Sequence, residues 1–193
     1  MRKKVAIFSG SFNPIHIGHL ALANYVCEAK LVDELWFMVT PQNPLKENKE
    51  LINESQRLDM VKKAIAGYDK FKACDLEFTL PRPSYTINTL QELKKRYADI
   101  DFSLLIGADN WTSFDQWKNG DDILRAFSLL VYPRMGFNID SSILPPNVRL
   151  VDSPILEISA TNIRTKIAEG KDYRYFLHHK VFEYIVSNRL YIR

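Results

Sequence analysis

His16 and His19 lie shortly after an apolar stretch near the start of this 193-residue chain. The stretch Val5–Phe8 has the β-branched and aromatic residues of a buried strand, and Gly10 lies in the turn behind it. Placed three residues apart on a helix, the two histidines share one face at its first turn. A helix N-terminus carries partial positive charge and free N–H groups, so this segment predicts a phosphate-binding site.

The turn itself suits the same chemistry. Glycine at position 10 lets the backbone turn tightly and leaves amide N–H groups open to an anion. Pro14 fits the approach to a helix start, and the imidazoles can gain positive charge when an anion binds nearby. No third ligand stands at metal-binding spacing, and the sequence contains neither G-x-G-x-x-G nor G-x-x-x-x-G-K-[ST].

A second candidate segment lies near the end of the chain, in residues 158–164, which read I-S-A-T-N-I-R. Ser159 is a residue type that caps helices, and Arg164 falls early on the helix that would follow. A guanidinium in that position can bind phosphate oxygens. The pattern predicts that Arg164 joins the two histidines at one phosphate site.

Strand-like and helix-like segments alternate along the chain. This alternation predicts an α/β fold, a Rossmann-like doubly wound parallel sheet with helices on both faces and a C-terminal helical segment. Ligands in such folds bind beyond the carboxyl ends of the strands. The expected strands are residues 5–8, 35–39, 71–76, 102–106, 127–132 and 148–151. The expected helices carry Leu20 to Cys27, Leu58 to Ile65, residues 86–97, 159–169 and 176–188, and residues 46–53 and 135–147 are expected to be loops.

Length and composition set broader limits. We expect one domain over residues 1–193, whose C-terminal helical part covers about 159–193. Hydrophobic residues make up 46% and charged residues 25%, as in ordinary globular proteins, and a net charge of +3 does not argue for nucleic acid or membrane. Two cysteines cannot form a disulfide framework, and the apolar stretch Val5–Phe8 is shorter than a secretory signal requires, so no secretory signal is expected. A cytoplasmic protein is expected.

With these residues in view, Ser9–Leu20 resembles the HxGH signature of the nucleotidyltransferase α/β phosphodiesterase superfamily, and 158–164 resembles its I-S-S-T-x-I-R signature. Further segments are similar to bacterial nicotinate-nucleotide adenylyltransferases: P-S-Y-T-I-N-T-L at 83–90, I-G-A-D and F-D-Q-W between 106 and 117, P-Q-N-P-L-K at 41–46, and Y-P-R at 132–134. The chain departs from the family pattern at Ser9, Asn13, Leu45 and Ala160.

The resemblance implies adenylyl transfer from ATP to nicotinate mononucleotide, which yields nicotinate adenine dinucleotide and pyrophosphate, a step of NAD biosynthesis. The nucleophile is then the mononucleotide's own phosphate, whose second pKa near 6 removes the need for a general base. Mg²⁺ is the expected cofactor, bound mainly through the ATP phosphates and not by protein side chains. The expected partners are these two small molecules, and a homo-oligomer is left open.

The motifs and the resemblance together assign site residues. The catalytic assignments are His16, His19, Lys46 and Arg164. The ATP-binding assignments are Ser9, Gly10, Ser11, Phe12, His16, His19, Gly107, Asp109, Ser159 and Arg164. The mononucleotide-binding assignments are Lys46, Tyr85, Thr86, Trp117 and Arg134. By resemblance Trp117 stacks on the pyridine ring, the backbone near Thr86 receives the ring carboxylate, and Asp109 contacts ribose hydroxyls or the metal ion.

Three alternatives stay open or are set aside. Another HxGH enzyme, acting on nicotinamide mononucleotide or on phosphopantetheine, shares the first motif, whereas residues 84–90 and Trp117 argue against phosphopantetheine. Class I aminoacyl-tRNA synthetases share H-I-G-H, but this chain lacks a K-M-S-K-S-like segment and is too short for a tRNA-binding domain. The third alternative is a non-catalytic nucleotide-binding module, against which both histidines, Lys46 and Arg164 argue.

Overall fold

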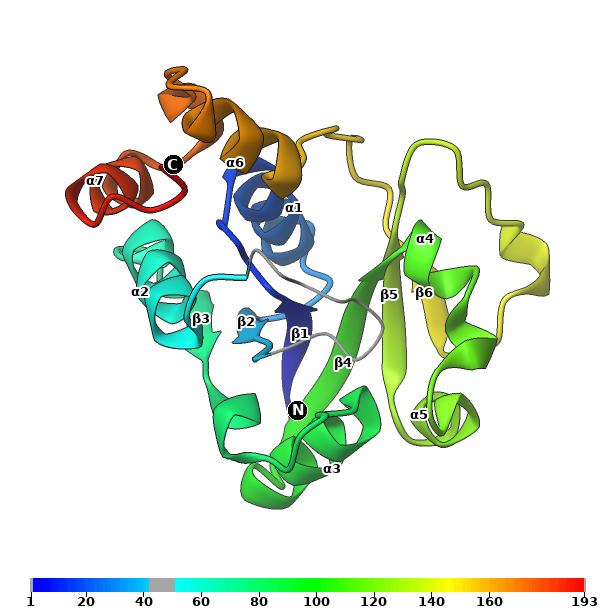
Figure 1. Cartoon of the computed structure of the whole chain (residues 1–193). Helices are drawn as coiled ribbons and strands as arrows, with labels where there is room; N and C mark the ends of the chain where they lie inside the picture. The colour runs from blue at the N-terminus through cyan, green and yellow to red at the C-terminus, as the bar shows by residue number, and fades with distance from the viewer. Residues whose placement is uncertain (1, 42–50, 193) are drawn as a thin grey trace.

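The protein is built on one six-stranded parallel sheet, seen at the centre of Figure 1. A computed structural model describes residues 2–41 and 51–192. The strands follow the spatial order β3-β2-β1-β4-β5-β6, and every neighbouring pair runs parallel. Their bounds are β1 (Lys3–Gly10), β2 (Glu34–Val39), β3 (Phe71–Cys74), β4 (Ile100–Gly107), β5 (Ser128–Tyr132) and β6 (Val148–Leu150). The predicted fold class is therefore confirmed.

Helices cover both faces of the sheet (Figure 1). One face packs against α1 (Ile17–Glu28), α2 (Glu54–Ile65), α6 (Ala160–Ala168) and α7 (His179–Ser187). The other face packs against α3 (Thr86–Arg96), α4 (Ala108–Trp111) and α5 (Gly120–Ala126). Short 3-10 helices cover Leu76–Thr79, Phe114–Gln116, Ser141–Ile143 and Arg174–Phe176.

The continuous apolar runs reflect burial on both faces. Along β1, Ala6 and Phe8 join the core on the α1 face, whereas Val5 and Ile7 join the core on the α3 face. All four side chains are buried. A strand covered by helices on both sides needs apolar residues at every position, which is why these strands show no alternation of polar and apolar residues.

Several expected elements differ from the structure. The helices α4 and α5 were not predicted, because they are only four and seven residues long and turn-forming residues dominate this stretch. Asn119, which precedes α5, has a left-handed backbone with φ of 57°. The last helix begins at His179 and not at Phe176, and β3 ends at Cys74. Within the expected loop 135–147 lies one 3-10 turn, and residues 42–50 of the other expected loop lie outside the described part.

The strand order places the functional region. The chain runs outward in one direction from β1 to β3 and in the other from β4 to β6, so the order reverses between the neighbouring strands β1 and β4. Open parallel sheets bind ligands at such a switch, beyond the carboxyl ends of the two strands. In the described residues no helix has the length and apolar character needed to cross a bilayer.

Candidate active site

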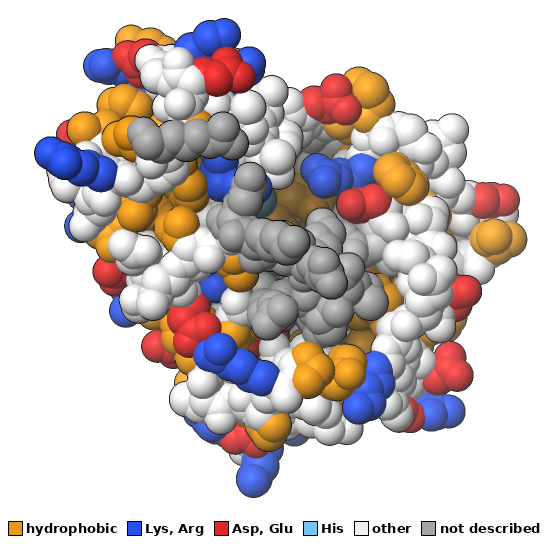
Figure 2. All heavy atoms as spheres, in the orientation of Figure 1, with side chains coloured by type: hydrophobic (Ala, Val, Ile, Leu, Met, Phe, Trp, Pro, Cys, Tyr) orange, Lys and Arg blue, Asp and Glu red, His pale blue; other side chains and the backbone are white. Residues whose placement is uncertain are grey.

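A cavity of about 910 Å³ opens where β1, β4 and β5 end. Its walls come from the start of α1, the segment after β5, and residues 153–164, which lead into α6. Figure 2 shows basic side chains on opposite sides of a hollow in this face of the molecule. Segments that are far apart in the sequence therefore meet at the predicted edge of the sheet.

The turn after β1 is shaped by Phe12. Its backbone is left-handed, with φ of 45°, and its side chain is buried against Phe8, Phe37 and His19. A Cβ on Gly10 would lie 3.1 Å from the Phe12 ring, so a side chain at this position would crowd that ring. The expectation that Gly10 itself supplies the tight turn is wrong, since the left-handed residue is Phe12.

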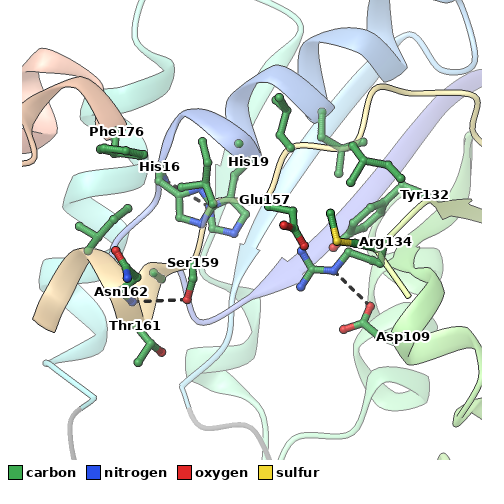
Figure 3. A pocket seen from close by; sticks show the side chains of 18 of the residues that line it. His16, His19, Asp109, Tyr132, Arg134, Glu157, Ser159, Thr161, Asn162 and Phe176 are labelled. Carbon is green, nitrogen blue, oxygen red and sulfur yellow. Dashed lines mark hydrogen bonds and ion pairs between the residues drawn. The ribbon is translucent and has the colours of Figure 1, made fainter. Parts of the chain in front are cut away.

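The two histidines of the motif stack on each other at the first turn of α1 (Figure 3). Their ring centroids are 3.6 Å apart and their planes differ by 22°. The backbone N–H of His16 donates to Nδ1 of His19 at 3.3 Å, so a neutral His19 carries its proton on Nε2. A Cβ on Gly18 would lie 3.2 Å from Nδ1 of His16, which explains the glycine between them. The result is a closely stacked pair of imidazoles that line the cavity.

Burial keeps these imidazoles neutral in the free protein. Desolvation, helped by the nearby Arg134, lowers the pKa of His16 to about 4. Desolvation also holds the pKa of His19 well below its usual range, with further contributions from His16 and Arg134. At neutral pH the pair therefore offers N–H donors without permanent charge, and the charge expected from the sequence would require a bound anion.

On the α6 side, Ser159 caps the helix by accepting a hydrogen bond at Oγ from the backbone N–H of Asn162 at 3.4 Å. Arg164 follows one turn later and lines the cavity. Its Nη1 donates to the backbone carbonyl of Asn13 at 2.9 Å. Arg164 thus joins the C-terminal motif to the turn after β1, across 151 positions of sequence.

The opposite wall carries an ion pair. Nε of Arg134, just beyond β5, lies 3.5 Å from Oδ1 of Asp109, the second residue of α4 (Figure 3). A Cβ on Gly107 would lie 2.3 Å from that carboxylate oxygen, so only glycine leaves room for Asp109 in this position. The Tyr132 ring beside them is largely buried, and burial raises its pKa. Arg134, expected at the mononucleotide, therefore shares a cavity with the histidines.

A separate polar cluster lies beneath the S-Y-T segment. Glu77 is only 4% exposed, and its carboxylate accepts hydrogen bonds from Oγ of Ser84 at 3.0 Å and Oγ1 of Thr89 at 2.9 Å. Burial raises the pKa of Glu77, while the two hydroxyl donors oppose that shift. The serine and the second threonine of the motif therefore point inward and hold the start of α3.

Trp117 lines a second hollow, and its neighbour Lys118 contacts Tyr85. Nζ of Lys118 lies 4.1 Å from the centre of the Tyr85 ring, which links the two segments. Trp117 packs on Phe114 with ring centroids 5.1 Å apart and lines a hollow of about 670 Å³. Its Nε1 is buried and has no hydrogen-bond partner among the described residues. This leaves an indole donor to be satisfied.

The structure brings about half of the assigned residues together in the main cavity. Those that line the main cavity are Ser11, His16, His19, Asp109, Arg134, Ser159 and Arg164. Trp117 lines the second hollow instead. The other assigned residues of the described chain do not line the main cavity, namely Ser9, Gly10, Phe12, Tyr85, Thr86 and Gly107. Lys46 lies outside the described residues.

Sequence reasoning missed other cavity residues and one supporting residue. Tyr132, Glu157 and Asn162 line the main cavity, and Glu157 points toward Arg134 in Figure 3. Arg57 is fully buried on α2 and donates to backbone carbonyls of the turns after β1 and β2. The sequence offered one signal for the burial of Arg57, because it lies next to Leu58 and near Val61 on the apolar face of a predicted helix.

The donor set of the cavity does not form a metal site of its own. Among residues 2–41 and 51–192 no group of three or more His, Cys, Asp or Glu side chains is arranged to hold a metal ion. The cavity is lined by the carboxylates of Asp109 and Glu157 together with two imidazoles and the guanidinium groups of Arg134 and Arg164. Such a wall suits a polyphosphate, which can bring its own Mg²⁺.

Comparison with known protein families identifies the family to which this chain belongs. The sequence profile described as cytidylyltransferase-like matches residues 7–166, a span that contains both signature motifs. The chain belongs to the cytidylyltransferase-like family. The predicted membership of this family of nucleotidyltransferases is thereby confirmed.

Individual relatives narrow the family. The chain is 56% identical to the probable nicotinate-nucleotide adenylyltransferase of Bacteroides fragilis over 96% of this chain and 92% of that protein. It is 47% identical to the protein of the same name from Cytophaga hutchinsonii, over 97% and 98% of the two chains. The resemblance to nicotinate-nucleotide adenylyltransferases thus extends over nearly the whole length of this cytidylyltransferase-like protein.

Solved structures support the fold. Nicotinic acid mononucleotide adenylyltransferase from Plasmodium falciparum, complexed with NaAD, superposes with a TM-score of 0.81 at 22% identity, covering 98% of this chain and 97% of that one. A putative nicotinate-nucleotide adenylyltransferase from Vibrio parahaemolyticus gives a TM-score of 0.73 at 23% identity, with 98% and 95% covered. At these identities the likeness concerns the fold of the cytidylyltransferase-like protein.

Proposed function

We propose that the chain transfers the adenylyl group of ATP to nicotinate mononucleotide, forming nicotinate adenine dinucleotide and pyrophosphate. The observation that carries the proposal is the stacked pair of neutral histidines at the start of α1, flanked by Arg164 and Arg134 in one cavity. Relatives named for this activity match over nearly the full length. The reaction is a step of NAD biosynthesis.

The chemistry asks for alignment and charge stabilisation. A phosphate oxygen of the mononucleotide attacks the α-phosphorus of ATP, the bond from that phosphorus to the bridging oxygen of the β-phosphate breaks, and pyrophosphate leaves with the electron pair. The attacking phosphate is largely dianionic at neutral pH, so no residue needs to remove a proton from it. Preorganised donors that face the developing negative charge supply most of the acceleration.

We assign that task to His16, His19 and Arg164. His19 donates from Nε2, because its Nδ1 already accepts the backbone N–H of His16. The bound triphosphate favours the protonated imidazoles, so positive charge can increase where negative charge develops. Lys46 is assigned by motif to the same phosphates. Arg134 lies in the histidine cavity and close enough to lower the pKa of both imidazoles.

Magnesium enters this scheme as part of the MgATP substrate. When bound, Mg²⁺ shields the phosphate charge and helps the pyrophosphate to leave. Of the assigned residues, Asp109 offers the one carboxylate in the main cavity, where its Oδ1 lies 3.5 Å from Nε of Arg134. The phosphate oxygens and water would provide the other ligands.

For the mononucleotide we infer a site that runs from the main cavity toward Trp117. The indole face suits a flat cationic pyridinium ring, and its buried Nε1–H has no partner in the described part of the chain. The amides that open α3 at Thr86 are suited to a carboxylate, and Tyr85 precedes them as the N-cap residue. This part of the site would select nicotinate through its ring carboxylate.

The test is a product assay with the full chain. The protein is incubated with MgATP and, in separate reactions, nicotinate mononucleotide, nicotinamide mononucleotide or phosphopantetheine, and products are read by mass and by pyrophosphate release. We expect nicotinate adenine dinucleotide and an equimolar amount of pyrophosphate, and loss of both when Mg²⁺ is chelated. Faster turnover of another acceptor would overturn the substrate assignment, and no pyrophosphate with any acceptor would overturn the enzyme assignment.

A further inference from the structure

The turn Ser11–Asn13, which leads to His16, is held from behind by three different parts of the chain. Phe12 in this turn has a left-handed backbone, a conformation that is strained for a large side chain and persists only where its surroundings enforce it. The residues before and after Phe12 are therefore the places where such support should act.

Both neighbours of Phe12 accept hydrogen bonds from distant parts of the chain. Nη1 of Arg57, on α2, donates to the carbonyl of Ser11 at 2.6 Å. Nη1 of Arg164, on α6, donates to the carbonyl of Asn13 at 2.9 Å. The third contact comes from the C-terminal end of the chain, where the hydroxyl of Tyr191 donates to Oδ1 of Asn13 at 2.8 Å, across 178 positions of sequence.

The environment of Tyr191 keeps its hydroxyl protonated, so that it can donate a hydrogen bond. It lies four residues beyond the end of α7, is largely buried, and has a left-handed backbone with φ of 64°. Burial raises the pKa of its hydroxyl, an effect only partly opposed by the nearby cations Arg164 and Arg57. The hydroxyl therefore keeps its proton throughout the physiological pH range and directs it at Asn13.

Asn13 is the point where this contact reaches the active site. It is 5% exposed, lines the main cavity and is followed by the buried residues Pro14, Ile15 and His16. Because those residues are tightly packed, a shift of Asn13 is transmitted to the imidazole of His16 and, through the stacked rings, to His19. Displacement of reacting groups by about 1 Å can cost on the order of 100-fold in rate.

We propose that Tyr191 is a positioning residue for the reaction: its hydroxyl, through Asn13, fixes the turn that presents His16 and His19 to the phosphates. The inference rests on the proposed function of that histidine pair. It makes the C-terminal end of the chain a part of the active site, although Tyr191 is not among the residues that line the main cavity.

The test removes one oxygen atom. Tyr191→Phe keeps the buried ring and loses only the hydroxyl, and we expect kcat to fall about tenfold while the KM for ATP changes less than about twofold. Tyr184→Phe is the matched control, because Tyr184 on α7 also donates its hydroxyl, here to Oδ2 of Asp59 on α2 at 3.2 Å, away from the turn. The control should keep wild-type kcat with a comparable change in Tm.

A double-mutant cycle identifies the route. If the hydroxyl acts through Asn13, then Tyr191→Phe should have little further effect on kcat in an Asn13→Ala background. Additive effects of the two substitutions, or equal kcat values for Tyr191→Phe and Tyr184→Phe, would overturn the inference.

A readout independent of activity separates this inference from the proposed function. Amide hydrogen exchange in residues 11–19 should become faster in Tyr191→Phe and remain unchanged in Tyr184→Phe. This result would support the positioning role of Tyr191 even if the wild-type protein released no pyrophosphate. Unchanged exchange in both variants would contradict it even if the wild-type enzyme were active.

Discussion

The turn after β1 and the S-Y-T segment before α3 use their motif residues in opposite ways. In the first region His16 and His19 face the main cavity. In the second, the hydroxyls of Ser84 and Thr89 face inward and donate to the buried carboxylate of Glu77. One motif thus consists of groups suited to contact a ligand, and the other contains groups that hold the backbone in place.

Burial acts on both regions with the same physics. It disfavours the charged form, so it lowers the pKa of His16 and raises the pKa of Glu77. Two hydroxyl donors inside the protein partly offset the cost of burying the Glu77 carboxylate. For the imidazoles, a bound anionic ligand would have to offset the cost of carrying charge. The comparison teaches that motif residues with similar sequence signals can serve chemistry in one place and architecture in another.

The largest expected effect is on turnover in His19→Ala. Loss of a donor that stabilises the transition state should lower kcat by roughly 100- to 1000-fold and raise KM values far less. Steady-state kinetics with both substrates varied would measure this. His179→Ala, at an exposed position at the start of α7, should behave as wild type. A kcat in His19→Ala close to that of the control would contradict a catalytic role for the histidine pair after β1.

The next effect concerns stability below neutral pH. The pKa of His16 is about 4 in the folded protein and near 6.5 when unfolded, so between these values the unfolded chain binds more protons. Stability should therefore fall as the pH drops from 7 to 4.5, and this histidine should account for about 2–3 kcal/mol of the loss. Urea unfolding at both pH values would show a smaller loss for His16→Asn, and His179→Asn should keep the wild-type loss. Equal losses in all three proteins would contradict the burial argument.

A moderate effect is expected at the other end of the site. Trp117→Ala should raise the KM for nicotinate mononucleotide about tenfold and leave the KM for ATP nearly unchanged, because ring stacking on an aromatic side chain contributes about 1–3 kcal/mol. Trp111→Ala is a suitable control, since Trp111 lines the same hollow and stacks on Phe114 at 5.5 Å. An equal rise of both KM values in Trp117→Ala would count against stacking on the pyridine ring.

The smallest effect tests the supporting role of the S-Y-T segment. Ser84→Ala removes one of the two donors to Glu77, so the start of α3 is held less firmly, and the KM for the mononucleotide should rise about threefold with kcat little changed. Thr79→Ala provides the comparison, because its hydroxyl donates to the carbonyl of Leu76 and not to Glu77. A large loss of kcat in Ser84→Ala would instead indicate that this hydroxyl contacts the reacting groups.

The sequence alone was sufficient for the sheet and its site-bearing edge. The strands β1, β2, β4 and β5 are covered on both faces, which requires continuous apolar runs. Such runs, alternating with helical segments, are enough to predict a parallel sheet from the sequence. The short helices α4 and α5 escaped prediction because a few residues with strong turn preference outweigh a weak helical signal. The sequence likewise identified the imidazole pair, since two histidines three residues apart after a buried strand can serve one face.

What only the tertiary structure decided is the environment and support of those groups. The neutral state of His16 depends on burial and on Arg134, more than one hundred positions away. The left-handed turn at Phe12 is bounded by contacts from Arg57, Arg164 and Tyr191, which come from three distant segments. The physical reason is that local sequence encodes backbone preference and burial pattern, whereas pKa values and backbone strain depend on which distant charges and donors the fold brings within a few ångströms.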